Sequence, residues 1–146
     1  MALVEAEDFP EIRALLDAQL TANDLRDTVI AADVHLGAAS REVLGRIPNA
    51  QAWVDAGDED GLRVKRIVKL LTAASLAPVV VRLTSVSVQG RDGAYSRQTF
   101  DPVKRAAELR GQAQAELALL AEYEEPPATT FLLPRTFVRA TGRRGR

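Results

Sequence analysis

The sequence contains no cysteine, and its only histidine is His35. The lack of cysteine excludes a disulfide framework, a thiolate nucleophile and any zinc site with cysteine ligands. A single imidazole without a nucleophile or a metal-ligand partner nearby cannot define a catalytic site. A structural or surface role is therefore favoured for His35.

Long apolar runs are also missing. No window approaches the roughly 18 uninterrupted apolar residues that a membrane-spanning helix needs. The first thirteen residues do not show a basic stretch followed by an apolar run, which is the pattern of a secretory signal. We therefore expect a protein of the cytosol that is neither secreted by a standard signal nor embedded in a membrane.

Catalytic and ligand-binding motifs are equally scarce. The acidic residues 58–60 lack the alternating oxygen ligands and the terminal glutamate of a calcium loop, so a solvated loop is favoured. Residues 90–93 contain two glycines, but no Lys-Ser/Thr pair follows, and a turn is favoured over a phosphate cradle. No serine lies in a nucleophile elbow or a Ser-x-x-Lys motif. The sequence predicts no enzyme, no cofactor and no metal site.

Charge is distributed unevenly along the 146 residues. Residues 1–125 carry 14 basic and all 20 acidic residues, whereas residues 126–146 hold five arginines and no acid. Because 47% of the residues are apolar, the chain has enough hydrophobic material for one globular core. We expect one domain over residues 1–125 and an extended basic C-terminal arm over residues 126–146, the arm being typical of an interaction segment.

Apolar spacing predicts a mainly α fold, a small bundle of about four helices. A short first helix follows the possible N-cap Asp8, and Asp101-Pro102 begins a last helix that ends near Tyr123. A turn of helix around Trp53 is possible within the loop between Pro48 and Gly61. The two remaining helices are expected over residues 25–46, with a narrow apolar seam, and over residues 62–77, ended by Pro78.

Residues 82–100 differ from the rest of the chain because they are rich in β-branched residues and alternate in polarity. With turn chemistry at residues 89–93, this pattern predicts an inserted β-hairpin. An isolated hairpin is marginal in water, so it should pack on the helices, on a partner or on copies of itself.

Two groups of residues are candidate interaction sites. In the arm, apolar clusters alternate with arginines, which suits a segment that orders on binding a partner protein. On the helix over residues 62–77, basic side chains fall outside the apolar arc and could follow DNA phosphates. The arm candidates are Phe131, Leu132, Leu133, Arg135, Phe137, Val138 and Arg139, and the basic-face candidates are Arg63, Lys65, Arg66 and Lys69.

Three short motifs follow one another in an informative order. Leu-Thr-Ala-Ala-Ser-Leu-Ala-Pro occupies residues 71–78, Tyr95-Ser96 follows, and Arg-Ala-Ala-Glu-Leu-Arg opens the segment 105–117. In this order the chain resembles the head-to-tail connector, or adaptor, family of tailed bacteriophages, over roughly residues 8–120.

The resemblance implies a structural head completion protein of the virion neck, between capsid and tail, assembled in the cytoplasm of the bacterial host. It implies a homo-oligomeric ring, usually of about twelve copies, bound to the portal protein. The ring would extend the DNA channel and provide a docking surface for the next neck or tail-completion protein. Genomic DNA would pass through without sequence-specific binding. The arm would reach along a neighbouring protein, with Arg135 and Arg139 pairing with acidic groups.

A second hypothesis is a small nucleic-acid-binding regulator that uses the basic helix face and the arginine-rich tail. It predicts an affinity for DNA that falls steeply with salt. The apolar anchors between the arginines favour protein over DNA as the target of the arm.

Overall fold

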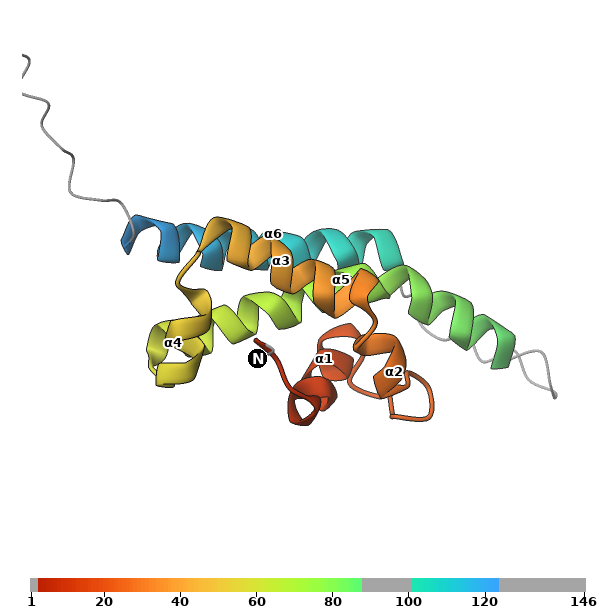
Figure 1. Ribbon diagram of the computed structural model, residues 1–146. Helices are drawn as coiled ribbons and strands as arrows, with labels where there is room; N and C mark the ends of the chain where they lie inside the picture. Colours follow the sequence, from red (N-terminus) through yellow and green to blue (C-terminus); the bar gives the residue numbers. More distant parts are fainter. Residues whose placement is uncertain (1–2, 88–100, 124–146) are drawn as a thin grey trace, which may run out of the picture.

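The computed structural model describes residues 3–87 and 101–123, and every regular element in these ranges is helical (Figure 1). The predicted mainly α class is therefore confirmed. Within the described ranges no helix is both long and apolar enough to cross a membrane. The elements in chain order are the 3-10 turn η1 (Ala6–Asp8), α1 (Phe9–Leu16), α2 (Asp27–Ile30), the π-helical turn η2 (Asp33–Gly37), α3 (Ala38–Arg46), α4 (Ala50–Ala56), α5 (Glu59–Ser87) and α6 (Pro102–Tyr123).

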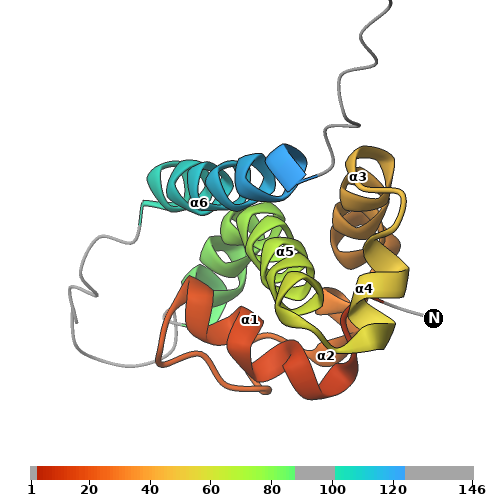
Figure 2. The same ribbon diagram turned by 90° about the vertical axis from the view of Figure 1, so that its left-hand side faces the viewer.

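Helix α5 is the centre of the molecule. Seen almost along its axis, it is surrounded by α6, α3, α4 and α1 (Figure 2). Helix α6 runs antiparallel to α5 and makes the most extensive packing contact with it (Figure 1). The side chains predicted to form the apolar face of α5 are all buried, namely Val64, Ile67, Val68, Leu71 and Ala74. One hydrophobic core therefore forms around a single central helix.

The prediction of one continuous helix over residues 25–46 is wrong. Helix α2 ends at Ile30, Ala32 adopts a ψ of 141°, and a π-helical turn leads into α3. The helix also starts later than predicted, and the Arg13 Nε donates to the carbonyl of Leu25 at 2.8 Å, an acceptor that a helix beginning at Leu25 would pair with the N–H of Val29. The break lets both Ile30 and Val43 reach the core with no exposed surface, although they lie on separate short helices.

The structure also corrects the prediction that Pro78 ends its helix. Helix α5 continues to Ser87, so residues 82–87 are helical and do not form the first strand of a hairpin. A proline inside a helix costs a hydrogen bond, but the buried face continues on both sides of it through Ala77 and Val80. Residues 82–87 are thus helical despite the β propensity of their side chains. Residues 88–100, the remainder of the predicted hairpin, lie outside the described residues.

The predicted start of α6 is confirmed. The Asp101 Oδ1 accepts hydrogen bonds from the backbone N–H groups of Val103 at 3.0 Å and Lys104 at 3.1 Å, as an N-cap does. Pro102 is the first helical residue. The inward-facing residues Leu109, Ala113, Leu117 and Leu120 are buried, whereas Val103, assigned to the same face, is 76% exposed.

The turn of helix expected around Trp53 is α4, which ends at Gly57 with a φ of 68°. The acidic segment that follows is more ordered than the predicted solvated loop. Asp58 Oδ1 accepts the backbone N–H of Gly61 at 2.8 Å and so caps α5, while Glu59 and Asp60 occupy the first turn of that helix. Carboxylates at this end also complement the helix dipole.

Candidate interaction surfaces

Lys69, expected on the exposed side of its helix, is buried between α5 and the start of α1. Its Nζ lies 2.7 Å from Asp8 Oδ1 and 2.6 Å from Glu11 Oε2, and its side chain is only 11% exposed. Asp8 also accepts the backbone N–H of Glu5 through its second carboxylate oxygen. Lys69 therefore stabilises the N-terminal segment on α5 and does not contribute to a free basic surface.

The charges of Asp8 and Lys69 stabilise each other. Burial by itself acts to raise the pKa of Asp8, but the hydrogen bonds from Lys69 and from the Glu5 backbone outweigh it, and the pKa of Asp8 is lowered. Burial likewise opposes the charge on Lys69, yet its contacts with Asp8 and Glu11 raise the pKa of the amine. Both groups therefore stay ionised at neutral pH.

The remaining basic-face candidates do not gather into one patch. The Arg63 Nη2 donates to Glu59 Oε1 at 2.9 Å, and the Arg66 Nε lies 3.9 Å from Glu116 Oε1 on α6. Lys65 is half-buried on the Asp8 side of α5, where its charge helps to lower the pKa of Asp8. Successive helical residues are rotated by about 100°, so the four cations point towards two different neighbours.

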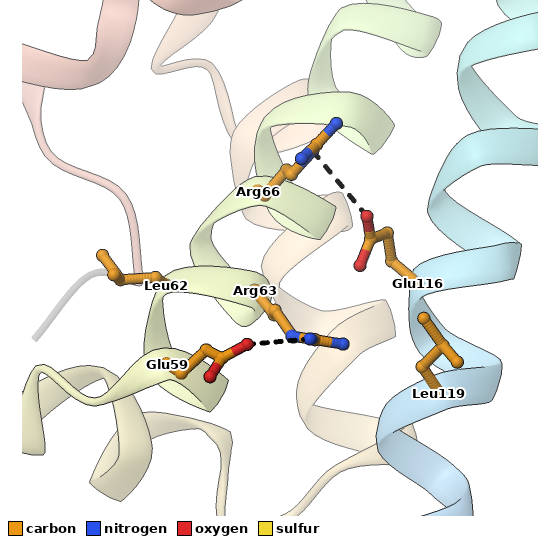
Figure 3. Close-up of a pocket in the computed structure, with 6 residues that line it drawn as sticks. All are labelled: Glu59, Leu62, Arg63, Arg66, Glu116 and Leu119. Carbon is orange, nitrogen blue, oxygen red and sulfur yellow. Dashed lines mark hydrogen bonds and ion pairs between the residues drawn. The ribbon is translucent and has the colours of Figure 1, made fainter.

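A groove lies where the start of α5 meets the end of α6 (Figure 3). Its volume is about 400 Å³, and Arg63 and Arg66 lie along it with their acidic partners. Two leucines border it, Leu62 on α5 and Leu119 on α6, and they are 63% and 47% exposed. Sequence periodicity could not predict this groove, because the groove depends on antiparallel packing of helix ends that are more than 50 residues apart in the chain.

His35 has a partner that the sequence did not reveal. Its Nδ1 lies 2.9 Å from the Oγ of Ser75 on α5. The Ser75 hydroxyl donates its proton to the carbonyl of Thr72 at 2.8 Å, so it accepts from the imidazole. A serine whose proton points away from the histidine is not arranged as a nucleophile with its base. The contact instead ties the π-helical turn to the central helix.

His35 should make the stability of the fold depend on pH. Burial lowers its pKa below the ordinary value of 6.5, so the folded protein favours the neutral imidazole. The unfolded chain then binds more protons near and below pH 6.5, and the free energy of unfolding should fall as the pH drops from 7.5 to 5.5. Urea unfolding at both pH values measures this difference. His35→Gln should reduce the difference in the free energy of unfolding between the two pH values. An equal difference in the variant would contradict the assignment of this pH dependence to His35.

Among residues 3–80 and 101–120, whose side chains the structure describes, no cluster of three or more histidine and carboxylate side chains is placed to hold a metal. Within these residues every buried side-chain nitrogen and oxygen has a hydrogen-bond partner. The arm candidates Phe131, Leu132, Leu133, Arg135, Phe137, Val138 and Arg139 lie outside the described residues. Comparisons of the chain with protein-family models, with curated proteins and with solved structures found no match.

Proposed function

We propose that the chain is a head-to-tail adaptor of a tailed bacteriophage, a non-enzymatic neck protein that forms a ring on the portal. Two of the three motifs of the resemblance support this proposal because they lie in the two helices at the centre of the bundle, while Tyr95-Ser96 lies outside the described residues. Residues 71–78 lie in the middle of α5, where Leu71, Thr72 and Ala74 are buried. Residues 105–117 form most of the part of α6 that packs on α5.

Arg105, the first residue of the third motif, has a clear structural role. Its Nε and Nη2 donate to the backbone carbonyl of Leu15 at 3.0 and 2.6 Å. Leu15 lies in the last turn of α1, where carbonyls lack partners within the helix. The arginine thus fastens α6 to α1, and the motif residues together fix three helices around one another.

The observation that carries the proposal is the placement of exposed apolar residues at opposite ends of the α5–α6 pair. Leu62 and Leu119 lie where α5 starts and α6 ends. Val103 lies at the other end, at the start of α6, where the last turns of α5 extend beyond the neighbouring helices (Figure 1). A cyclic oligomer needs two different surfaces on each subunit, because every copy meets its neighbour head to tail.

The charges of the body suit a ring around DNA better than a protein that grips DNA. Arg63, Arg66 and Lys69 are each engaged with carboxylates. A protein that binds DNA tightly presents cations that can replace the counterions of several phosphates. The nucleic-acid hypothesis therefore gains no support from the described helices.

The arm supplies the proposed contact with the portal. Its aromatic residues Phe131 and Phe137 are the anchors that would enter apolar pockets of the partner, while Arg135 and Arg139 would pair with acidic groups at the rim. Aromatic and arginine side chains dominate the energetics of such interfaces.

Deleting residues 126–146 should reduce attachment of the protein to purified portal rings while its helical circular dichroism stays unchanged. Co-sedimentation with portal rings measures attachment. Substitution of Arg143, Arg144 and Arg146 by glutamine is the matched control, because it removes three charges but leaves the apolar anchors in place. Unchanged attachment of the deletion variant would contradict the proposal, as would tight, steeply salt-dependent binding of the intact protein to duplex DNA.

A further inference from the structure

We propose that the groove between the start of α5 and the end of α6 is the docking site for the chain's own C-terminal arm. The groove is defined by Leu62, Leu119, Arg63, Arg66, Glu59 and Glu116. The proposed occupant is the segment 131–138, which contains both apolar clusters of the arm. This docking is a property of the isolated chain, and it holds or fails independently of attachment to a portal.

The shape and lining of the groove suit an apolar peptide segment. Its volume of about 400 Å³ lies within the range of sites that hold small ligands or a few side chains. Leu62 and Leu119 contribute apolar surface to a lining that also holds four charged residues, so the groove suits a segment with both apolar and basic side chains. In Figure 3 the side chain of Arg63 extends from α5 towards Leu119, and its aliphatic stem offers further carbon surface to a bound aromatic ring.

The groove lies close to the end of α6, which favours the chain's own arm as its occupant. Leu119 is four residues before Tyr123, the last residue of α6, which corresponds to about 6 Å along the helix axis. Residues 124–130 then separate the helix from Phe131, and seven residues can span up to about 23 Å. The first apolar cluster of the arm can therefore return to the groove of its own subunit.

Charge also favours docking of the arm in the groove. The end of the molecule around the groove carries the acidic residues Asp58, Glu59, Asp60 and Glu116 against the two arginines. The side chain of Glu59 is 80% exposed, whereas that of Glu116, 3.9 Å from Arg66, is 23% exposed. The arm brings five arginines and no acid. Its arginines can thus pair with carboxylates that the bundle leaves accessible.

Tethering makes docking within one chain more favourable than docking between two chains. A segment on a short flexible linker has an effective concentration in the millimolar range at a nearby site. A contact too weak to hold two molecules together in dilute solution is then still well populated within one molecule. We therefore commit to the arm of the same chain as the occupant in the unassembled protein.

A spin label on the full-length chain tests the proposal. The sequence has no cysteine, so Thr136→Cys creates a single attachment point for a nitroxide between Arg135 and Phe137. The methyl resonances of Leu62 and Leu119 should lose intensity relative to the reduced, diamagnetic sample. The methyl resonances of Val103, at the other end of α6, should keep theirs. Equal effects at all three residues, or no effect, would overturn the proposal.

A mixed sample separates the chain's own arm from that of a second copy. Spin-labelled, isotopically silent chains are combined with isotope-labelled chains that carry no cysteine. Docking within one chain predicts no loss of intensity at Leu62 or Leu119 in this mixture. Loss in the mixture equal to that in the first sample would assign the groove to a second copy and would overturn the proposal.

Two sets of variants test the side chains. Phe131→Ala and Phe137→Ala leave the described helices untouched, and each should lower the ratio of docked to free arm by at least about tenfold, the effect of exposing one large apolar side chain. Leu119→Ser should also release the arm, whereas Val103→Ser is a matched control on the same helix. Intensity loss at Leu62 that is unchanged by the phenylalanine substitutions would show that the arm does not dock through its apolar clusters.

Discussion

Replacing Lys69 by methionine should lower the free energy of unfolding by about 3 kcal/mol, because removing one partner of a largely buried ion pair leaves the other charge uncompensated. Asp8 is the group left behind, with a side chain only 12% exposed and its Oδ1 2.7 Å from the lysine amine in the native protein. Methionine retains much of the apolar stem of lysine, so the change isolates the loss of charge. Urea unfolding followed by circular dichroism measures the difference.

Arg66→Met is the matched control, because it removes a cation from the same helix at an exposed position. The side chain of Arg66 is 67% exposed and lies 3.9 Å from its carboxylate, so its loss should cost less than about 0.5 kcal/mol. The double variant Asp8→Asn, Lys69→Met should recover part of the stability lost in the single variant. Equal effects of Lys69→Met and Arg66→Met would contradict the buried role of Lys69.

The ion pair between Asp8 and Lys69 should also affect the stability of the protein in acid. The pKa of Asp8 is lowered in the folded protein from its ordinary value of 3.8, so the stability it contributes is complete above that value. This contribution is lost as the pH falls below 3.8 and through the lowered pKa. Without Lys69 the carboxylate lacks the contact that opposes the effect of its burial. In the Lys69→Met variant this acid-dependent loss should therefore be smaller, because the folded state no longer holds the pKa of Asp8 as far below 3.8.

Local sequence patterns were enough to predict the faces of the two long helices. Except for Val103 and the half-buried Ala106 near the start of α6, the periodic apolar residues of α5 and α6 are buried because one side of each helix packs on the same core. The N-cap at Asp101 and the helical turn at Trp53 were predictable for a related reason, since both depend on residues within one or two turns of each other.

The predictions failed where a distant residue decides the outcome. The chain breaks after Ile30, while the carbonyl of Leu25 is engaged by Arg13, twelve residues earlier. Helix α5 passes Pro78 because the core accepts residues on both sides of it. Lys69 is drawn inward by Asp8 and Glu11, 61 and 58 positions away in the sequence. Periodicity along a helix contains no information about such partners.

In the candidate interaction surfaces, too, local sequence indicates some features, whereas others depend on packing between helices. The sequence placed four basic residues of α5 outside the apolar arc, but Lys69 is buried, and the pairing of these residues with Glu116 and Asp8 depends on how other segments pack on α5. The groove beside Leu119 could not be predicted, because neither α5 nor α6 alone contains it. The arm stays a prediction from composition, since residues 126–146 lie outside the described residues.

Replacing Gly61 by alanine should destabilise the protein by about 2–3 kcal/mol, although alanine is the better helix former. A Cβ atom at this position would lie 2.2 Å from the backbone oxygen of Trp53 and 2.7 Å from its carbonyl carbon. Both are backbone atoms of α4, so no side-chain rotation can relieve the clash. Helices α4 and α5 would have to separate, which would also disturb the cap formed by Asp58.

Gly111→Ala is the control for this substitution, because a Cβ atom there would have no neighbour within 4 Å. Gly111 lies at an exposed position inside α6, and alanine should raise the free energy of unfolding by about 0.5–1 kcal/mol. The two substitutions are chemically identical. If urea unfolding gives changes in the free energy of unfolding of opposite sign, the difference is due to the contact between α4 and α5. Emission from Trp53, the single tryptophan, should change only in the Gly61 variant. A stabilising effect of Gly61→Ala would mean that α4 is not held against the start of α5, which is also one wall of the groove proposed to hold the arm.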